Sequence, residues 1–215
     1  MPLPFENRVQ AGRELALACA DRPGLEDPVV LGLPRGGVPV AAEVAAGLGT
    51  PFDIFVVRKL GVPGQPELAM GAIASGGIRV DNAAVVRHLG ISKATIDEVA
   101  KRELTELERR ERVYRGDRPP VQVTGRTVVL VDDGLATGAT LRAAVVAVRT
   151  LGPGRIIVAV PVGAPESARL LGELADEVVC LYSPESFGAV GAYYTDFRQT
   201  TDDEVRRLLD RPLRR

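Results

Sequence analysis

The chain has 215 residues, of which 46% are apolar and 26% charged, as in an ordinary globular protein with a sizeable core. Its net charge of −1 argues against a nucleic-acid-binding protein that relies on bulk positive charge. Cys19 and Cys180 lie far apart without metal-ligating neighbours, so both are expected to be buried thiols in a reducing compartment. The N-terminus lacks the apolar core of a signal peptide, and no apolar run is long enough to span a membrane. We therefore expect a cytoplasmic protein that binds neither nucleic acid nor membrane.

Segments in which apolar residues recur at helical spacing alternate along the chain with short segments that are apolar throughout. The runs predict strands, in chain order, over 29–33, 54–57, 128–131, 156–160 and 178–181. The helical patterns cover 5–20, a stretch after Gly37 to about 48, 92–115, a stretch after the third strand to about 151, a segment between the last two strands, and 202–209. Residues 60–80 are rich in glycine and proline, so they are expected to form loops with at most short strands.

The predicted helix over 92–115 is unusually long and charged. Its apolar stripe is Ile96, Ala100, Leu104 and Leu107, and Thr95 with Glu98 is expected to form a capping box. The favoured interpretation is a solvated helix with i,i+4 ion pairs such as Glu106–Arg110 and Glu108–Arg112. Covering the active site and forming an oligomer contact are the alternatives.

Apolar strands alternating with helices predict an α/β fold with a doubly wound, mostly parallel sheet covered on both faces. In such sheets ligands bind beyond the carboxyl ends of the strands. Three segments with charged side chains or glycines fall at predicted strand ends: 32–37, 58–59 and 132–140. Their convergence predicts a binding site at this edge.

The segment Val128–Thr140, VVLVDDGLATGAT, is the most informative part of the chain. A fully apolar strand leads into the carboxylates of Asp132 and Asp133, which can accept hydrogen bonds from two neighbouring hydroxyls. The loop that starts at Thr137 then opens a helix, whose backbone N–H groups can bind a phosphate. This layout favours a sugar phosphate as ligand. No GxxxxGK[ST] motif is present, which argues against a P-loop nucleotide hydrolase.

The same segment resembles the 5-phosphoribosyl-1-pyrophosphate (PRPP) motif of the type I phosphoribosyltransferases: four apolar residues, two acids, three variable residues, then Thr/Ser-Gly-x-Thr/Ser. The resemblance implies one domain over 1–215, with a core over about 29–181. A small hood is implied over 182–215, with a possible contribution from the N-terminus, and 92–115 is a helical insertion. It implies that Asp132 and Asp133 hold the ribose hydroxyls directly or through Mg²⁺, and that the second acid is a candidate for assisting the reaction. The 5′-phosphate cradle would consist of Ala136, Thr137, Gly138, Ala139 and Thr140.

The pyrophosphate half of the substrate is assigned to two other strand ends. The loop with Arg35, Gly36 and Gly37 resembles the family's pyrophosphate loop in position and glycine content, with Arg35 as the cation and the glycines as N–H donors. Arg58 and Lys59 match the place where family members keep a basic residue for pyrophosphate. The segment 61–77 is expected to be either a mobile lid or a passive loop.

Five of the nine aromatic residues fall between 182 and 197: Tyr182, Phe187, Tyr193, Tyr194 and Phe197. They predict either a satellite hydrophobic cluster or a stacking site for a flat base in the hood, with Phe187 as the best single candidate.

The favoured function is Mg²⁺-dependent transfer of 5-phosphoribosyl from PRPP to a nitrogenous acceptor, a nucleobase above all, by a protein that can form a homo-oligomer. No Ser-His or Cys-His arrangement for covalent catalysis is evident, and displacement at the anomeric carbon needs none. One alternative is a non-catalytic sensor of PRPP or a nucleotide with the same fold. Another is a partner module that works beside a second enzyme. The identity of the acceptor stays open at this stage.

Overall fold

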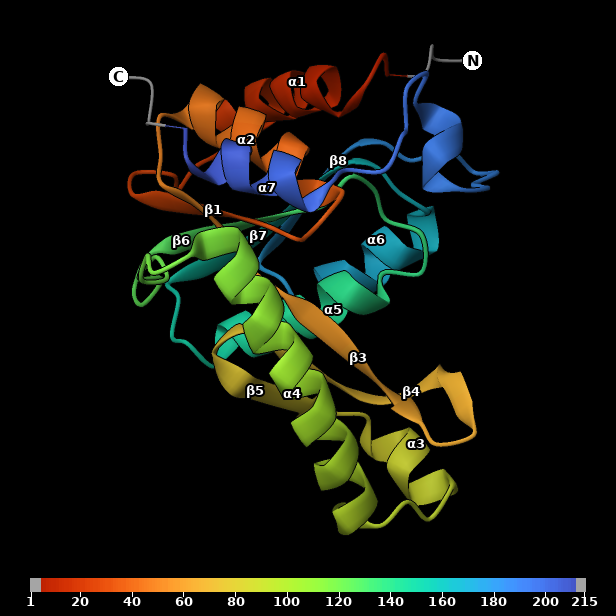
Figure 1. Ribbon diagram of the computed structural model, residues 1–215. Coiled ribbons are helices and arrows are strands. Elements are labelled where there is room, and N and C mark those ends of the chain that lie inside the picture. The colour runs from red at the N-terminus through yellow and green to blue at the C-terminus, as the bar shows by residue number, and fades with distance from the viewer. Residues whose placement is uncertain (1–4, 212–215) are drawn as a thin grey trace.

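The computed structural model describes residues 5–211 (Figure 1). Its centre is a five-stranded sheet of order β2-β1-β6-β7-β8 in which every neighbouring pair is parallel. The strands are β1 (Pro28–Gly32), β2 (Phe52–Ile54), β6 (Thr127–Val131), β7 (Arg155–Val162) and β8 (Glu177–Tyr182). This sheet confirms the predicted α/β fold.

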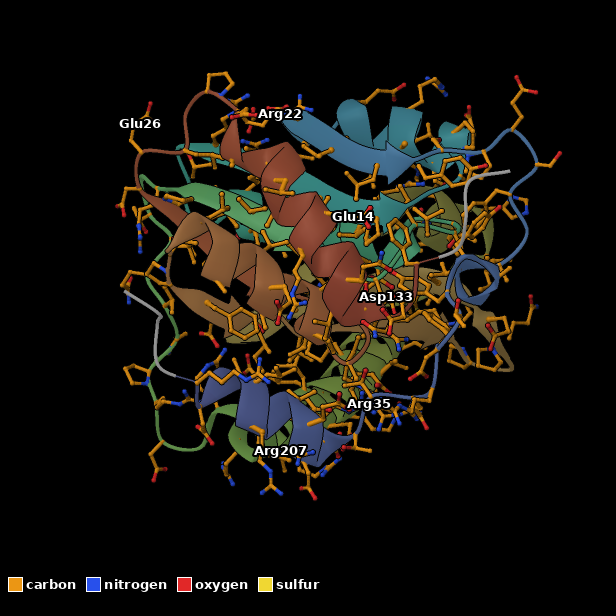
Figure 2. All side chains as sticks on the ribbon, turned by 90° about the horizontal axis from the view of Figure 1, so that it is seen from above. Glu14, Arg22, Glu26, Arg35, Asp133 and Arg207 are labelled. Carbon is orange, nitrogen blue, oxygen red and sulfur yellow. The ribbon has the colours of Figure 1, made fainter. Side chains whose placement is uncertain are left out.

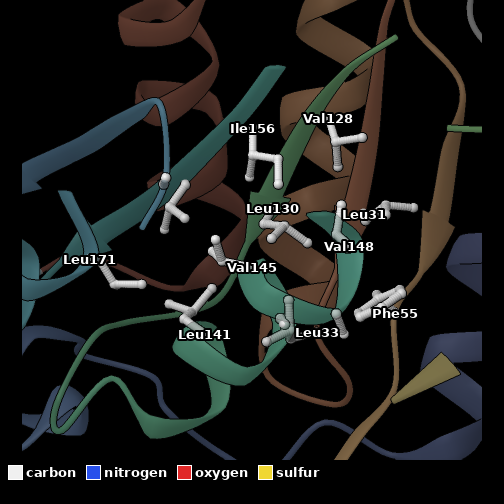
Figure 3. Close-up of a cluster of buried hydrophobic side chains, with 14 of the residues drawn as sticks. Leu31, Leu33, Phe55, Val128, Leu130, Leu141, Val145, Val148, Ile156 and Leu171 are labelled. Carbon is white, nitrogen blue, oxygen red and sulfur yellow. The ribbon is translucent and has the colours of Figure 1, made fainter. Parts of the chain in front are cut away.

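Helices cover both faces of the sheet (Figure 1). Helices α1 (Arg8–Ala20) and α2 (Gly37–Leu48) pack on one face, and α5 (Ala139–Arg149) and α6 (Pro165–Gly172) on the other. Alternate residues of β6 serve the two faces: Leu130 joins the core under α5 (Figure 3), whereas Val129 joins the core under α1 and α2. Because both faces are buried from Val128 onward, these four positions of the strand are all apolar.

A second, antiparallel sheet follows β2, and we call it the flap sheet. It consists of β3 (Val57–Val62), β4 (Gln65–Ala74) and β5 (Ile78–Asp81), with the 3-10 turn η1 (Ser75–Gly77) before the last strand. Two predictions are therefore wrong. The apolar run 54–57 is divided between two sheets, and residues 60–80 are mainly strand.

The glycines of this region suggest loops from sequence alone, but in the structure Gly61 and Gly71 lie in strands at places where a neighbouring backbone comes close. A Cβ at Gly61 would lie 2.8 Å from the Pro66 carbonyl oxygen, and one at Gly71 would lie 2.6 Å from the Val80 carbonyl oxygen. Glycine inside a strand often marks such an approach of another backbone.

Helix α4 (Lys93–Arg115) lies against the flap sheet, after the short α3 (Ala83–His88). The predicted stripe faces inward, with Ile96, Ala100 and Leu107 buried and Leu104 half-buried. The predicted capping box is wrong, because Ser92 is the N-cap and its Oγ accepts a hydrogen bond of 3.1 Å from the Thr95 N–H.

Three side-chain contacts fasten α4 to the rest of the domain. Arg115 pairs with Asp53 of β2 at 3.1 Å, with both side chains at most 10% exposed. The Tyr114 hydroxyl donates 2.9 Å to Asp202, the first residue of α7 (Asp202–Leu209), and Glu103 pairs with Arg58 of β3. The helix therefore buttresses the domain as well as facing solvent. The predicted Glu106–Arg110 pair is present at 2.9 Å.

The first described residues pair with a segment near the C-terminus. Phe5 pairs with Tyr194 in a parallel bridge, and the Thr195 N–H donates 2.8 Å to the Phe5 carbonyl. The 3-10 helix η2 (Val190–Tyr193) lies in this C-terminal segment. Of the two thiols, Cys19 is buried as expected and Cys180 is half-buried. None of the helices within residues 5–211 has the length and apolar character needed to cross a bilayer.

Candidate functional site

Two helix N-termini meet at the switch point of the parallel sheet. In the order β2-β1-β6 the loops after β1 and β6 leave neighbouring strands at the same edge. Helices α2 and α5 start there, with Gly36 and Gly138 as N-caps and no side-chain cap on either. By contrast, α1, α4 and α7 each have a side-chain oxygen that accepts from the first turn. At the start of α5 the N–H groups of Thr140 and Leu141 are thus left available to an anion. At the start of α2, by contrast, the Gly37 N–H donates 3.0 Å to the Leu33 carbonyl, the Val38 N–H donates 3.2 Å to the Arg35 carbonyl, and the next residue is a proline without an N–H.

The loop after β1 rests directly on the acid pair after β6. A Cβ at Gly36 would lie 2.7 Å from Asp133 Cγ and closer still to its Oδ2. A Cβ at Gly37 would lie 2.8 Å from Asp132 Cα and 3.0 Å from its Oδ1. Only glycine fits at both positions without a shift, so the predicted pyrophosphate loop and the predicted ribose acids form one continuous surface. The peptide bond between Pro34 and Arg35 is cis.

The loop from Leu135 to Thr140 is held from below. The Leu135 N–H donates 2.8 Å to Val162 at the end of β7, and the Ser167 hydroxyl of α6 donates 2.5 Å to the Ala136 carbonyl. Gly138 has φ +71°, a conformation that L-residues rarely adopt, and it is buried beneath the turn. The remaining predicted cradle residues, Ala136, Thr137, Ala139 and Thr140, are exposed. A rigid turn thus presents them to solvent.

The two carboxylates differ in their surroundings. Burial, with the neighbouring Asp133 charge as the next cause, raises the pKa of Asp132 well above its usual range. One Asp132 oxygen accepts 2.9 Å from the Asp133 N–H. Burial also raises the pKa of Asp133, but there the Arg8 guanidinium opposes the shift. It is therefore energetically unfavourable for both carboxylates to be charged at this buried place, as is common where a ligand binds.

Arg8, which sequence reasoning missed, occupies one side of this pair. Its Nε and Nη2 lie 2.8 and 2.7 Å from Asp133 Oδ2, and its Nη1 donates 2.9 Å to the Arg198 carbonyl. The guanidinium lies 3.9 Å from the centre of the Phe197 ring, and the Tyr194 hydroxyl donates 2.6 Å to the Asp133 carbonyl. Figure 2 shows Asp133 beside the N-terminal end of α1, with Arg35 near α7.

No sequence signal points to Arg8 beyond a cation in the first turn of a helix, where the helix dipole disfavours it. Its partners lie 125 and 190 residues away along the chain.

The three predicted pyrophosphate cations are placed differently. The Arg35 side chain is 34% exposed and faces α7, with Nη1 3.7 Å from Asp202 Oδ1. Arg58 is not brought to the acid pair, because it is half-buried against Glu103 of α4. Lys59 points to the opposite face of the flap sheet and pairs with the fully exposed Glu67 at 3.1 Å.

Lys59 lines a cleft of about 500 Å³ between the flap sheet and α5. The cleft also contains Ala139 and Thr140 of the predicted phosphate cradle, and Arg142 one turn further along α5. The structure therefore places Lys59, and not Arg58, in a cavity shared with the cradle.

The hood aromatics pack mainly on one another. Phe187 is half-buried and stacks on Tyr193 with ring centres 5.5 Å apart, and Tyr194 stacks on Phe197 at 5.0 Å. These rings form a satellite cluster with Phe5 and Tyr182. One face of Phe187 is thus already taken, so this residue has less surface to offer a base than the sequence prediction assumed.

The chemistry of the acid pair fits Mg²⁺ only in part. Within residues 5–211 no group of three His, Cys, Asp or Glu side chains is arranged to hold a metal ion. Mg²⁺ is often bound by one or two carboxylates together with substrate phosphates and waters. Asp132 and Asp133 meet that requirement when the substrate supplies the remaining oxygens, although one Asp133 oxygen is already held by Arg8.

A doubly wound sheet with an acid pair, a glycine-capped helix start and a glycine loop at its switch point defines a type I phosphoribosyltransferase-like domain. Comparison with known families agrees: the family described as phosphoribosyl transferase domain matches residues 4–198. The chain belongs to this family, which confirms the resemblance read from the motif.

Two similar proteins illustrate the relationship. A protein named as a candidate phosphoribosyl transferase, Rv0571c of Mycobacterium tuberculosis, is 51% identical over 207 residues, which are 96% of this chain and 46% of that protein. The chain thus spans about half the length of this relative. The crystal structure of TT1426 from Thermus thermophilus superposes with a TM-score of 0.87 at 48% identity and covers 96% of this chain and 98% of that one.

Proposed function

We propose that this domain transfers the 5-phosphoribosyl group of PRPP to a nitrogenous acceptor, with a nucleobase as the favoured class, and releases pyrophosphate in the presence of Mg²⁺. One observation carries the proposal: the start of α5, without a side-chain cap, and the loop of Arg35 lie beside one carboxylate pair, with Gly36 and Gly37 packed on the acids themselves. Two anion sites that flank a hydroxyl acceptor match the two phosphate ends and the sugar of PRPP.

Each part of the site has one task in this scheme. The α5 N-terminus with Thr137 and Thr140 binds the 5′-phosphate, and Asp132 and Asp133 accept hydrogen bonds from the ribose hydroxyls. The Arg35 guanidinium and the backbone of the loop before α2 bind the pyrophosphate. Together they fix the anomeric carbon between the leaving group and the acceptor.

The reaction breaks the bond from the anomeric carbon to a pyrophosphate oxygen and forms a bond to the acceptor nitrogen, whose proton leaves to solvent or a base. Charge separates as the bond breaks, so the ring becomes cationic while negative charge grows on pyrophosphate. The carboxylates favour the positive charge on the ring, and the Arg35 guanidinium favours the negative charge on pyrophosphate. Bound Mg²⁺ would add charge neutralisation at the pyrophosphate.

The test is turnover of PRPP by the purified chain against a panel of nucleobases, with and without Mg²⁺, measured as pyrophosphate release. We expect release that depends on one base and on Mg²⁺. PRPP binding is measured in parallel by calorimetry on the wild type and on Asp132→Asn with Asp133→Asn, which is expected to abolish binding.

Asp176→Asn is the matched control, because Asp176 pairs with Arg149 and accepts from the Ile156 N–H at the opposite, N-terminal end of β7. This variant should bind PRPP normally. Tight PRPP binding without base-dependent release would overturn the transferase and support a PRPP sensor. Unchanged PRPP affinity in the double variant would overturn the ribose assignment.

A further inference from the structure

Arg8 joins three segments that are far apart in sequence. It stands at the first turn of α1, binds Asp133 of the motif through two nitrogens, and donates to the Arg198 carbonyl in the C-terminal segment. Phe197 packs on its flat face. The Arg8 and Asp133 side chains are only 11% and 15% exposed. Such a set of contacts needs the planar fork of a guanidinium, which a lysine cannot reproduce.

Because of this contact, the two adjacent carboxylates have different hydrogen-bond partners. Asp133 Oδ2 is held by Arg8 beneath Gly36, whereas the Asp132 carboxylate has only the Asp133 N–H as a hydrogen-bond partner among the described residues. Arg8 also cancels one of two negative charges at a site where a polyphosphate must bind. Without that cation the acids would repel the ligand, and Asp133 would lose the partner that fixes its orientation.

We propose that Arg8 is a positioning residue for PRPP: it holds Asp133 against the pyrophosphate loop and offsets its charge, and so prepares the acid pair to receive the ribose and its phosphates. The inference rests on the proposed function and extends it to a residue outside the motif. It also gives a role to the contact between the start of α1 and the segment at Arg198, which Arg8 brings to the acid pair.

The chain contains a matched control. Arg115 makes a similar set of contacts with Asp53: its Nε donates to both carboxylate oxygens and its Nη2 donates to the Ile54 carbonyl, with side chains 10% and 6% exposed. This pair ties α4 to β2 and does not contact the motif. A purely structural role for Arg8 would make Arg8→Met and Arg115→Met behave alike.

The experiment measures PRPP affinity by calorimetry and thermal unfolding for Arg8→Met, Arg8→Lys, Arg115→Met, Asp133→Asn and the double variant of Arg8→Met with Asp133→Asn. We expect both methionine variants to lose thermal stability, but only Arg8→Met to bind PRPP at least tenfold more weakly. Arg8→Lys should lie between the wild type and Arg8→Met, because it restores the charge without the fork. The double variant should bind no more weakly than Asp133→Asn alone.

Wild-type PRPP affinity in Arg8→Met would overturn the proposal. So would a loss of affinity in the double variant equal to the product of the two single-variant losses, since Arg8 would then not act through Asp133. If Arg8→Met fails to fold, Arg8→Lys decides, and an unchanged affinity in that variant overturns the proposal. A wild-type protein that does not bind PRPP would overturn the proposed function itself, a result distinct from a PRPP-binding wild type with an indifferent Arg8.

Discussion

Gly36→Ala tests the contact between the pyrophosphate loop and the acid pair with a single methyl group. Gly36 has φ −60° and ψ −38°, so alanine suits the backbone, and relief of chain entropy alone would stabilise the protein by about 0.4–1 kcal/mol. The new Cβ would, however, lie 2.7 Å from Asp133 Cγ. Carbon atoms pack at roughly 3.5–4 Å, so the loop or the carboxylate must retreat by about 1 Å.

The steric effect outweighs the entropic gain. Overpacking of this kind costs roughly 1–3 kcal/mol. For a domain of this size we expect the melting temperature to fall by roughly 2–4 °C per kcal/mol. A displacement of about 1 Å at a reacting geometry can cost on the order of a hundredfold in rate. PRPP affinity should therefore fall at least tenfold, and base-dependent pyrophosphate release should fall further.

Calorimetric unfolding and PRPP titration provide the measurements. Gly172→Ala is the control, because Gly172 ends α6 and a Cβ there meets no atom within 4 Å. That variant should be unchanged or slightly more stable and should bind PRPP normally. An unaltered melting temperature in Gly36→Ala would show that the two loops are not in contact. A lower melting temperature with intact PRPP binding would show that Asp133 lies outside the binding site.

Three further predictions follow from the charges around the site. Asp132→Asn should abolish PRPP binding and yet raise the melting temperature above neutral pH, because burial raises the pKa of Asp132 and makes its charged form costly. The wild type regains this stability as pH falls through the raised pKa of Asp132 toward the ordinary value of about 4, because the carboxyl is then protonated. The difference in melting temperature between Asp132→Asn and the wild type should therefore shrink at low pH. A constant difference between pH 8 and pH 5 would contradict the reasoning. Lys59→Gln should weaken PRPP binding, whereas Arg58→Gln should mainly lower stability, on the order of 2 kcal/mol, because Glu103, 14% exposed, loses Arg58 and keeps only the exposed Arg102 as a partner. Urea unfolding and PRPP titration of both variants decide, and a larger loss of affinity in Arg58→Gln would refute the assignment. Tyr114→Phe removes the bond to Asp202 and should cost about 1 kcal/mol in urea unfolding, and no loss would show that this bond does not fasten α4 to α7.

The local chemistry of the donor site could be predicted from sequence. Val128–Val131 has no polar position because both faces of a central parallel strand are buried, and the acids and the Thr-Gly-Ala-Thr loop follow at fixed spacing. Such features are contiguous, so their geometry follows from a strand, a turn and a helix start. The same reasoning located the loop at Gly36 and Gly37, since carboxyl ends of parallel strands share one edge.

Prediction failed where contacts over long sequence distances decide. Glycines at Gly61 and Gly71 suggested loops, yet they allow strands of the flap sheet to approach closely. Arg58 and Lys59 are adjacent in sequence and looked equivalent. A strand sends neighbouring side chains to opposite faces, so one meets α4 and the other faces the cleft beside α5.

By itself the sequence determined the fold class, the family and the order of strand, acid pair and helix start at the candidate site, because each depends on periodicity or on one contiguous motif. Tertiary structure alone decided which cation meets which acid. Arg8 reaches Asp133 across 125 residues, Arg35 faces Asp202, and Glu103 takes Arg58 away from the site. Ion pairs depend on the positions of side-chain ends in space, and no local pattern encodes the packing of α1, α4 and α7 that sets those positions.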